Sequence, residues 1–131
     1  MRRPAPAIGF LVAATLGCAS AAPATPDSPS EVALHVGEKA QVRGEIVLTF
    51  VGVAQDSRCP KGEQCITAGK ARVQVEATPR GGSGIQLELD TSRETEAEVG
   101  RYRVSLVSLE PAPVAGRSIS PAEYVAKLSV R

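Results

Sequence analysis

The chain of 131 residues is poor in aromatic residues and in histidine. It has no tryptophan, two tyrosines, two phenylalanines and a single histidine, His35. The scarcity of aromatic side chains predicts an aliphatic core. A Ser–His–Asp site would have to use His35, and one histidine beside a cysteine pair does not make a zinc site with four ligands in a recognisable spacing. We therefore expect no metal and no cofactor.

Catalytic motifs and long runs of like charge are also missing. No G-x-S-x-G, H-E-x-x-H or P-loop pattern occurs. His35, Glu88 and Asp90 occupy polar positions of alternating segments, so we expect all three side chains to face solvent. The formal net charge is +1, without the basic stripe that is typical of nucleic-acid binding. These absences predict a protein that is not an enzyme and does not bind nucleic acid.

The first residues indicate export. Arg2 and Arg3 precede an apolar run over residues 7–16, and small residues follow it. That order is typical of a secretory signal peptide, and the run is shorter than the roughly 20 apolar residues of a membrane-spanning helix. We expect residues 1–17 to be a signal peptide.

Cys18 ends a segment, Thr15-Leu16-Gly17-Cys18, that resembles the lipobox of bacterial lipoproteins. The resemblance implies cleavage before Cys18, acylation of that cysteine, and a lipoprotein anchored in a membrane of the cell envelope. The alternative is an ordinary signal-peptidase cut after Ala21 or Ala22, which leaves a soluble periplasmic or secreted protein.

The remaining chain divides into a tether and one domain. Residues 18–30 are rich in Pro, Ala and Ser and lack large apolar side chains, as expected of a tether. Residues 31–131 have the length of a single domain. Apolar and β-rich segments predict strands over residues 32–36, 46–53, 71–77, 85–89, 102–109 and 124–130. We predict an all-β fold, a small antiparallel sandwich or open barrel of about six to eight strands.

Local signals add detail to this fold. Residues 79–84 predict a hairpin, and a shift of the alternation at Leu106 and Val107 predicts a β-bulge. Residues 120–123 favour a short helical start with Pro121 in its first turn. Residues 92–99 allow one helical turn, and the acidic stretch 94–98 is expected to be a solvated loop rather than a calcium site.

Two cysteines, Cys59 and Cys65, remain for the domain. Export would place them where disulfides persist, so we expect them to pair. Five residues separate them, which excludes a C-x-x-C redox pair. Closing so short a loop stabilises a fold by about 2 kcal/mol.

The segment Asp56-Ser-Arg-Cys-Pro60, followed by Cys65 and by Ala68-Gly69, resembles a motif of uncharacterised bacterial secreted proteins and lipoproteins. The resemblance extends loosely from Leu34 to Val130. It implies a shared fold and no particular activity.

Two interpretations of this loop remain open. In the structural one, Asp56 caps the turn, Arg58 pairs with it, and the disulfide holds a strand crossover. In the other, Arg58, Lys61 and Glu63 project from a rigid loop and bind a partner. The sequence predicts a non-catalytic envelope lipoprotein whose partners are the membrane, through its lipid anchor, and an envelope protein. The alternative is a secreted hydrolase, or a protease inhibitor presenting Arg58 or Lys61.

Overall fold

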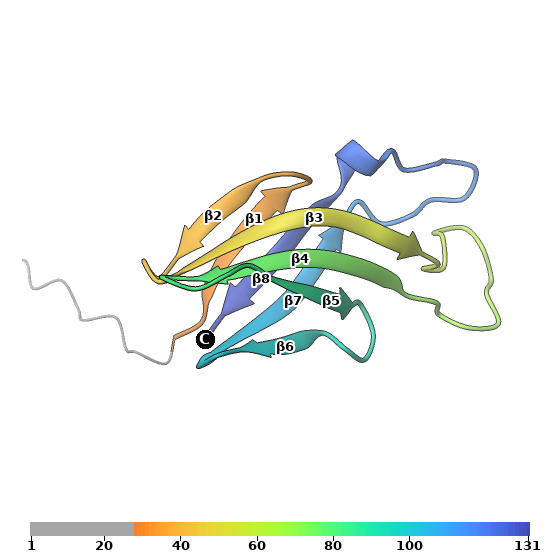
Figure 1. The fold of residues 1–131 in the computed structure, drawn as a ribbon. Helices are drawn as coiled ribbons and strands as arrows, with labels where there is room; N and C mark the ends of the chain where they lie inside the picture. The colour runs from red at the N-terminus through yellow and green to blue at the C-terminus, as the bar shows by residue number, and fades with distance from the viewer. Residues whose placement is uncertain (1–27) are drawn as a thin grey trace, which may run out of the picture.

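The computed structural model describes residues 28–131, which form a sandwich of two four-stranded antiparallel sheets (Figure 1). One sheet has the order β1-β8-β7-β6 and the other β2-β3-β4-β5. The elements are β1 (Ser30–His35), β2 (Lys39–Val42), β3 (Ile46–Asp56), β4 (Ala71–Pro79), β5 (Ile85–Asp90), β6 (Glu96–Val99), β7 (Tyr102–Glu110), the 3-10 turn η1 (Pro121–Glu123) and β8 (Val125–Val130). The predicted all-β fold is confirmed as a sandwich. The predicted signal peptide and most of the predicted tether lie outside the described residues.

The core fills the space between the two sheets and is almost entirely aliphatic. Within residues 28–131, Phe50 is the one aromatic ring that is fully buried. Alternation along β4 places Ala71, Val73, Val75 and Ala77 inside, each without exposed surface, while the residues between them face outward. This period of two is the pattern that a half-buried strand requires.

Strand β3 is the longest element, and two β-bulges adjust its path. The register with β4 shifts between Phe50 and Gly52 and again between Val53 and Gln55. After the second shift Asp56 stands opposite Ala71, which is fully buried. Directly opposite residues share a face of the sheet. The bulges therefore leave the Asp56 carboxylate on the inner face at the end of the sandwich.

Several local predictions are confirmed. The hairpin at residues 79–84 joins β4 to β5, and the register of β7 with β8 shifts between Leu106 and Ser108, where the alternation changes phase. The backbone N–H of Glu123 donates to the carbonyl of Ser120 at 2.9 Å and closes the short η1 turn.

The prediction for residues 92–99 is wrong, because Glu96–Val99 forms strand β6 instead of a helical turn or a loop. Val99 is buried and Ala97 is half-buried, so the inward face is too small to give a clear period. The strand pairs with β7, and the Arg103 side chain of β7 forms an ion pair with Glu98 of β6.

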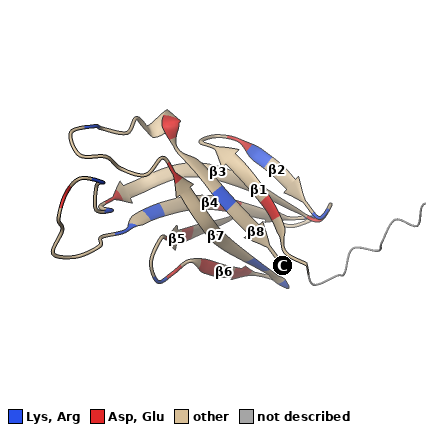
Figure 2. Ribbon diagram, turned by 180° about the vertical axis from the view of Figure 1, so that it is seen from behind, with Lys and Arg blue, Asp and Glu red and all other residues tan. Residues whose placement is uncertain are grey.

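The two ends of the sandwich differ in character (Figures 1 and 2). At one end the β2–β3, β4–β5 and β6–β7 turns lie together with Ser28; we call this the three-turn end. At the other end the long connections 57–70 and 111–120 extend beyond the strands; we call this the loop end. The chain thus enters the domain opposite the cysteine loop.

Candidate functional site

The cysteine loop, residues 57–70, is closed by the predicted disulfide. The sulfur atoms of Cys59 and Cys65 lie 2.13 Å apart and their Cα atoms 5.9 Å apart. Below the disulfide, the backbone of Ser57 donates to Lys70 at 2.8 Å and that of Cys59 donates to Ala68 at 3.0 Å. The loop therefore continues the β3–β4 hairpin as a narrow, cross-linked extension.

Gly69 is required at the base of this loop. Its φ of +65° lies in the left-handed region, which residues other than glycine rarely adopt. A Cβ atom at this position would stand only 1.7 Å from the carbonyl oxygen of Ser57. The close approach explains why the motif that begins at Asp56 ends in glycine.

The connection 111–120 supports the cysteine loop from the side. The backbone N–H of Lys61 donates to Pro113 at 2.9 Å, and the N–H of Ala115 donates back to Lys61 at 3.0 Å. Lys61 and Val114 form a parallel bridge through these bonds. The cysteine loop and the connection 111–120, about fifty residues apart in the chain, thus pair with each other beyond the strands. We call these two paired segments the projection.

Beneath the projection, Asp56 and Arg58 form a half-buried ion pair. Nε and Nη2 of Arg58 donate to the two carboxylate oxygens of Asp56 at 2.9 and 2.7 Å, and Tyr124 donates its hydroxyl to the same carboxylate at 3.0 Å. Arg58 also donates to the carbonyls of Leu109 and Pro111 at 2.8 and 3.0 Å. The pair fastens the end of β3 to β7 and to the residue that precedes β8.

Arg58 is therefore turned inward, with its side chain only 15% exposed and its three guanidinium nitrogens bonded within the domain. The sequence placed Arg58 in two roles, as a brace and as a binding residue. Its position matches the brace. Lys61 and Glu63, the other two candidates, have exposed side chains on the projection. Of the two basic residues that an inhibitor would present, only Lys61 faces outward.

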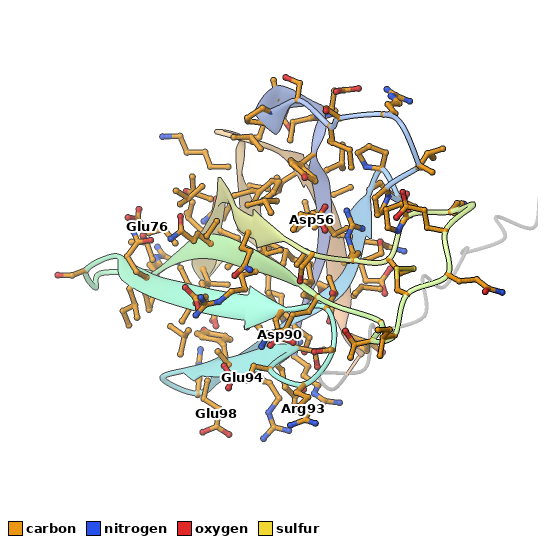
Figure 3. All side chains as sticks on the ribbon, turned by 90° about the vertical axis from the view of Figure 1, so that its right-hand side faces the viewer. Asp56, Glu76, Asp90, Arg93, Glu94 and Glu98 are labelled. Atoms are coloured by element: carbon orange, nitrogen blue, oxygen red, sulfur yellow. A yellow bond between two sulfur atoms is a disulfide. The ribbon has the colours of Figure 1, made fainter. Side chains whose placement is uncertain are left out.

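A second carboxylate, Asp90, corrects the sequence analysis, because it is 3% exposed instead of facing solvent. The chain after β5 folds over it, so Oδ1 accepts backbone bonds from Ser92, Arg93 and Glu94 at 2.8, 2.7 and 3.1 Å. Lys70 donates to Oδ2 at 2.7 Å. Figure 3 shows both carboxylates from the loop end, Asp56 on β3 and Asp90 on β5, with β4 between the two strands. Glu88 does face solvent, where it pairs with Arg72.

Both carboxylates give a prediction for acid stability. Hydrogen bonds from the Arg58 side chain lower the pKa of Asp56, and those from Lys70 and the backbone lower the pKa of Asp90, from an ordinary value of 3.8. Because the folded chain binds these protons more weakly, the stabilisation is complete above that value and is lost as the pH falls below it. We expect the melting temperature to be level from about pH 7 to about pH 5 and to fall below about pH 4.

Thermal melts of Asp56→Asn and of Glu63→Gln test this assignment. The Asp56 variant should show a smaller acid-induced fall, whereas the variant at exposed Glu63 should follow the parent. Identical profiles for the parent and Asp56→Asn would exclude Asp56 as a source of the pH dependence.

The most exposed large apolar side chain of the described part is Ile66, with a relative accessibility of 105%. It directly follows Cys65, so the disulfide holds its backbone in place. Val114, 43% exposed, lies on the adjoining segment of the projection. Sequence analysis missed Ile66. The available signal was an isoleucine outside any alternating strand, surrounded by small and polar residues.

The remaining candidates do not gather into a catalytic site. His35 is exposed, as expected, and its backbone N–H donates to Glu38. Among residues 28–131 no three His, Cys, Asp or Glu side chains are placed to share a metal ion. The same part of the chain has no helix of the length and hydropathy needed to span a bilayer. No protein-family model, curated protein or solved structure matched the chain, so the resemblance of its cysteine motif stays a prediction.

Proposed function

We propose that the chain is a non-catalytic lipoprotein of the cell envelope. Its β-sandwich would be held to a membrane through acylated Cys18, and it would bind another envelope protein through the projection at the loop end. The observation that supports binding to a partner protein is the fully exposed Ile66 on a disulfide-closed loop. The Thr15–Cys18 segment is the support for the anchor.

The projection has the properties of a preorganised binding element. Its backbone is fixed by the disulfide, by the ladder to Lys70 and by the bridge to Val114, so little conformational entropy remains to be lost on binding. An exposed aliphatic anchor on the same loop as exposed charged side chains, here Lys61 and Glu63, resembles the core and rim of a protein interface.

The placement of the two ends agrees with this function. Ser28 lies at the three-turn end, where Arg43 donates to its carbonyl, and the projection lies at the opposite end (Figure 1). A chain anchored at Cys18 would therefore present Ile66 away from its own membrane attachment. The half-buried Asp56–Arg58 pair serves binding indirectly, because it fastens the base of the projection.

A photo-crosslinking amino acid placed at Lys61 in growing cells tests the binding half. We expect a discrete adduct with an envelope protein, weakened at least about tenfold by Ile66→Ser, because loss of a buried anchor costs about 1.4 kcal/mol or more. The matched control carries the same crosslinker at Val107, an aliphatic residue of β7 that is 47% exposed. Equal adducts at both positions, or an adduct insensitive to Ile66→Ser, would contradict the proposal.

A further inference from the structure

The three-turn end carries one arginine in each of its turns. Arg43 lies between β2 and β3, Arg80 between β4 and β5, and Arg101 between β6 and β7. The connecting residues of these turns contain one carboxylate, Glu45. The turns are joined to one another, because the backbone of Arg80 donates to the Glu45 carbonyl at 2.6 Å and the Arg101 side chain bonds to the Glu45 carboxylate.

A pocket of about 410 Å³ opens between these turns. Pro79, Val99 and Tyr102 form apolar parts of its wall, and Arg80 and Arg101 line it as well. A second hollow of about 320 Å³ shares Arg101 and Tyr102 with the first and adds Glu98, Arg103 and Arg131. Arg103 pairs there with Glu98, and Arg131 pairs with Glu96. The guanidinium of Arg80 is exposed and makes no ion pair or hydrogen bond with the described residues.

The charge of Glu45 is already engaged inside the pocket. Tyr102 and Arg101 both bond to its carboxylate, and these bonds lower the pKa of Glu45. Arg43 also lies near enough to contribute to that shift. Arg101 is thus paired with Glu45, whereas the guanidinium of Arg80 has no partner among the described residues. A guanidinium beside apolar walls suits a phosphate group that carries a hydrocarbon portion.

The position of this end indicates where such a phosphate would come from. Ser28 is ten residues from Cys18, so the chain between them spans at most about 35 Å in any conformation. Anchoring at Cys18 would hold the three-turn end close to the lipid surface at a high effective concentration. Anionic headgroups attract nearby arginines at short range, within a Debye length of about 8 Å at physiological salt.

We propose that the three-turn end docks onto the anionic phospholipids of the anchoring membrane, with a lipid phosphate in the pocket beside Arg80 and Arg101. The inference rests on the proposed lipid anchor and deepens it: the tether would confine the domain, and the arginines would orient it. The projection with Ile66 then points away from the bilayer.

Vesicle flotation tests the docking surface without the anchor. The protein is the mature chain from Ala19 onward, exported behind a conventional cleavable signal so that the disulfide can form and no lipid is attached. The vesicles are phosphatidylcholine alone or phosphatidylcholine mixed with phosphatidylglycerol. We expect binding to the anionic vesicles only, and its loss between about 50 mM and about 500 mM salt, because screening removes the attraction.

Arg80→Gln should weaken the partition about fivefold, the effect of one positive charge near an anionic surface. Arg93→Gln is the matched control, an exposed arginine in the β5–β6 connection at the opposite end of β5 from Arg80 (Figure 3). Equal binding to both kinds of vesicle, or equal losses at Arg80 and Arg93, would overturn the proposal. Because this chain has no lipid, such a failure would leave the Cys18 anchor standing, and the anchor is tested separately by Cys18→Ser.

Discussion

Replacing Asp56 with alanine is expected to lower the free energy of unfolding by about 3 kcal/mol, close to the loss seen when one partner of a buried ion pair is removed. Both side chains of the pair are mostly covered, at 13% and 15% exposure. Without the carboxylate, the Arg58 guanidinium keeps its bonds to Leu109 and Pro111 but loses its counter-charge, and the Tyr124 hydroxyl loses its acceptor. Urea denaturation of the oxidised protein measures the change.

Three comparisons make the result specific. Tyr124→Phe removes a single hydrogen bond and should cost about 1 kcal/mol. The double variant Asp56→Ala with Arg58→Ala should be less destabilised than the sum of its single variants, because no unpaired charge remains. Lys61→Ala, on the exposed projection, should stay within about 0.5 kcal/mol of the parent. Equal effects at Asp56 and Lys61 would show that the ion pair is not a brace.

The strands that could be predicted from the sequence are those in which several apolar side chains recur at a period of two or form a β-rich run. Strand β4 places four such residues at a period of two, and its pattern is unambiguous. The two short strands β2 and β6 each bury one side chain, Val42 and Val99, so their alternation is too brief to detect. They form because each pairs with a neighbouring strand, β2 with β3 and β6 with β7. This pairing is a tertiary interaction that a local sequence pattern does not report.

The candidate site shows the same division between local and distant contacts. The Asp56–Arg58 pair and the disulfide join residues two and six positions apart, and the sequence predicted both. Tyr124 lies 68 positions from Asp56, and the Leu109 carbonyl lies 51 positions from Arg58, so no local pattern could connect them. Asp90 was misplaced for a different reason, because the loop that follows it buries its side chain, and the alternation along the strand does not report this.

Replacing Cys18 with serine is expected to release the protein from the membrane almost completely. The Thr15–Cys18 segment predicts acylation of this residue, and each buried methylene of an acyl chain contributes about 0.8 kcal/mol to membrane binding. Three arginines on the three-turn end would attract the domain too weakly to retain it in washed membranes at high salt. Serine lacks the thiol that carries the lipid, so the variant should lose the anchor while keeping the same β domain.

Cell fractionation followed by mass analysis of the mature N-terminus separates the two signal-peptide hypotheses. An acylated parent begins at Cys18 and fractionates with membranes, whereas an ordinary cut leaves a soluble chain that begins near Ala22 or Pro23. Ala19→Ser is the matched control, because it alters the neighbouring residue without touching the thiol. If the parent is recovered free in the medium, or Cys18→Ser stays as firmly bound as Ala19→Ser, acylated Cys18 is not what holds the protein. The loop-end projection would then act on a freely diffusing protein, and the orientation inferred from Ser28 would lose its basis.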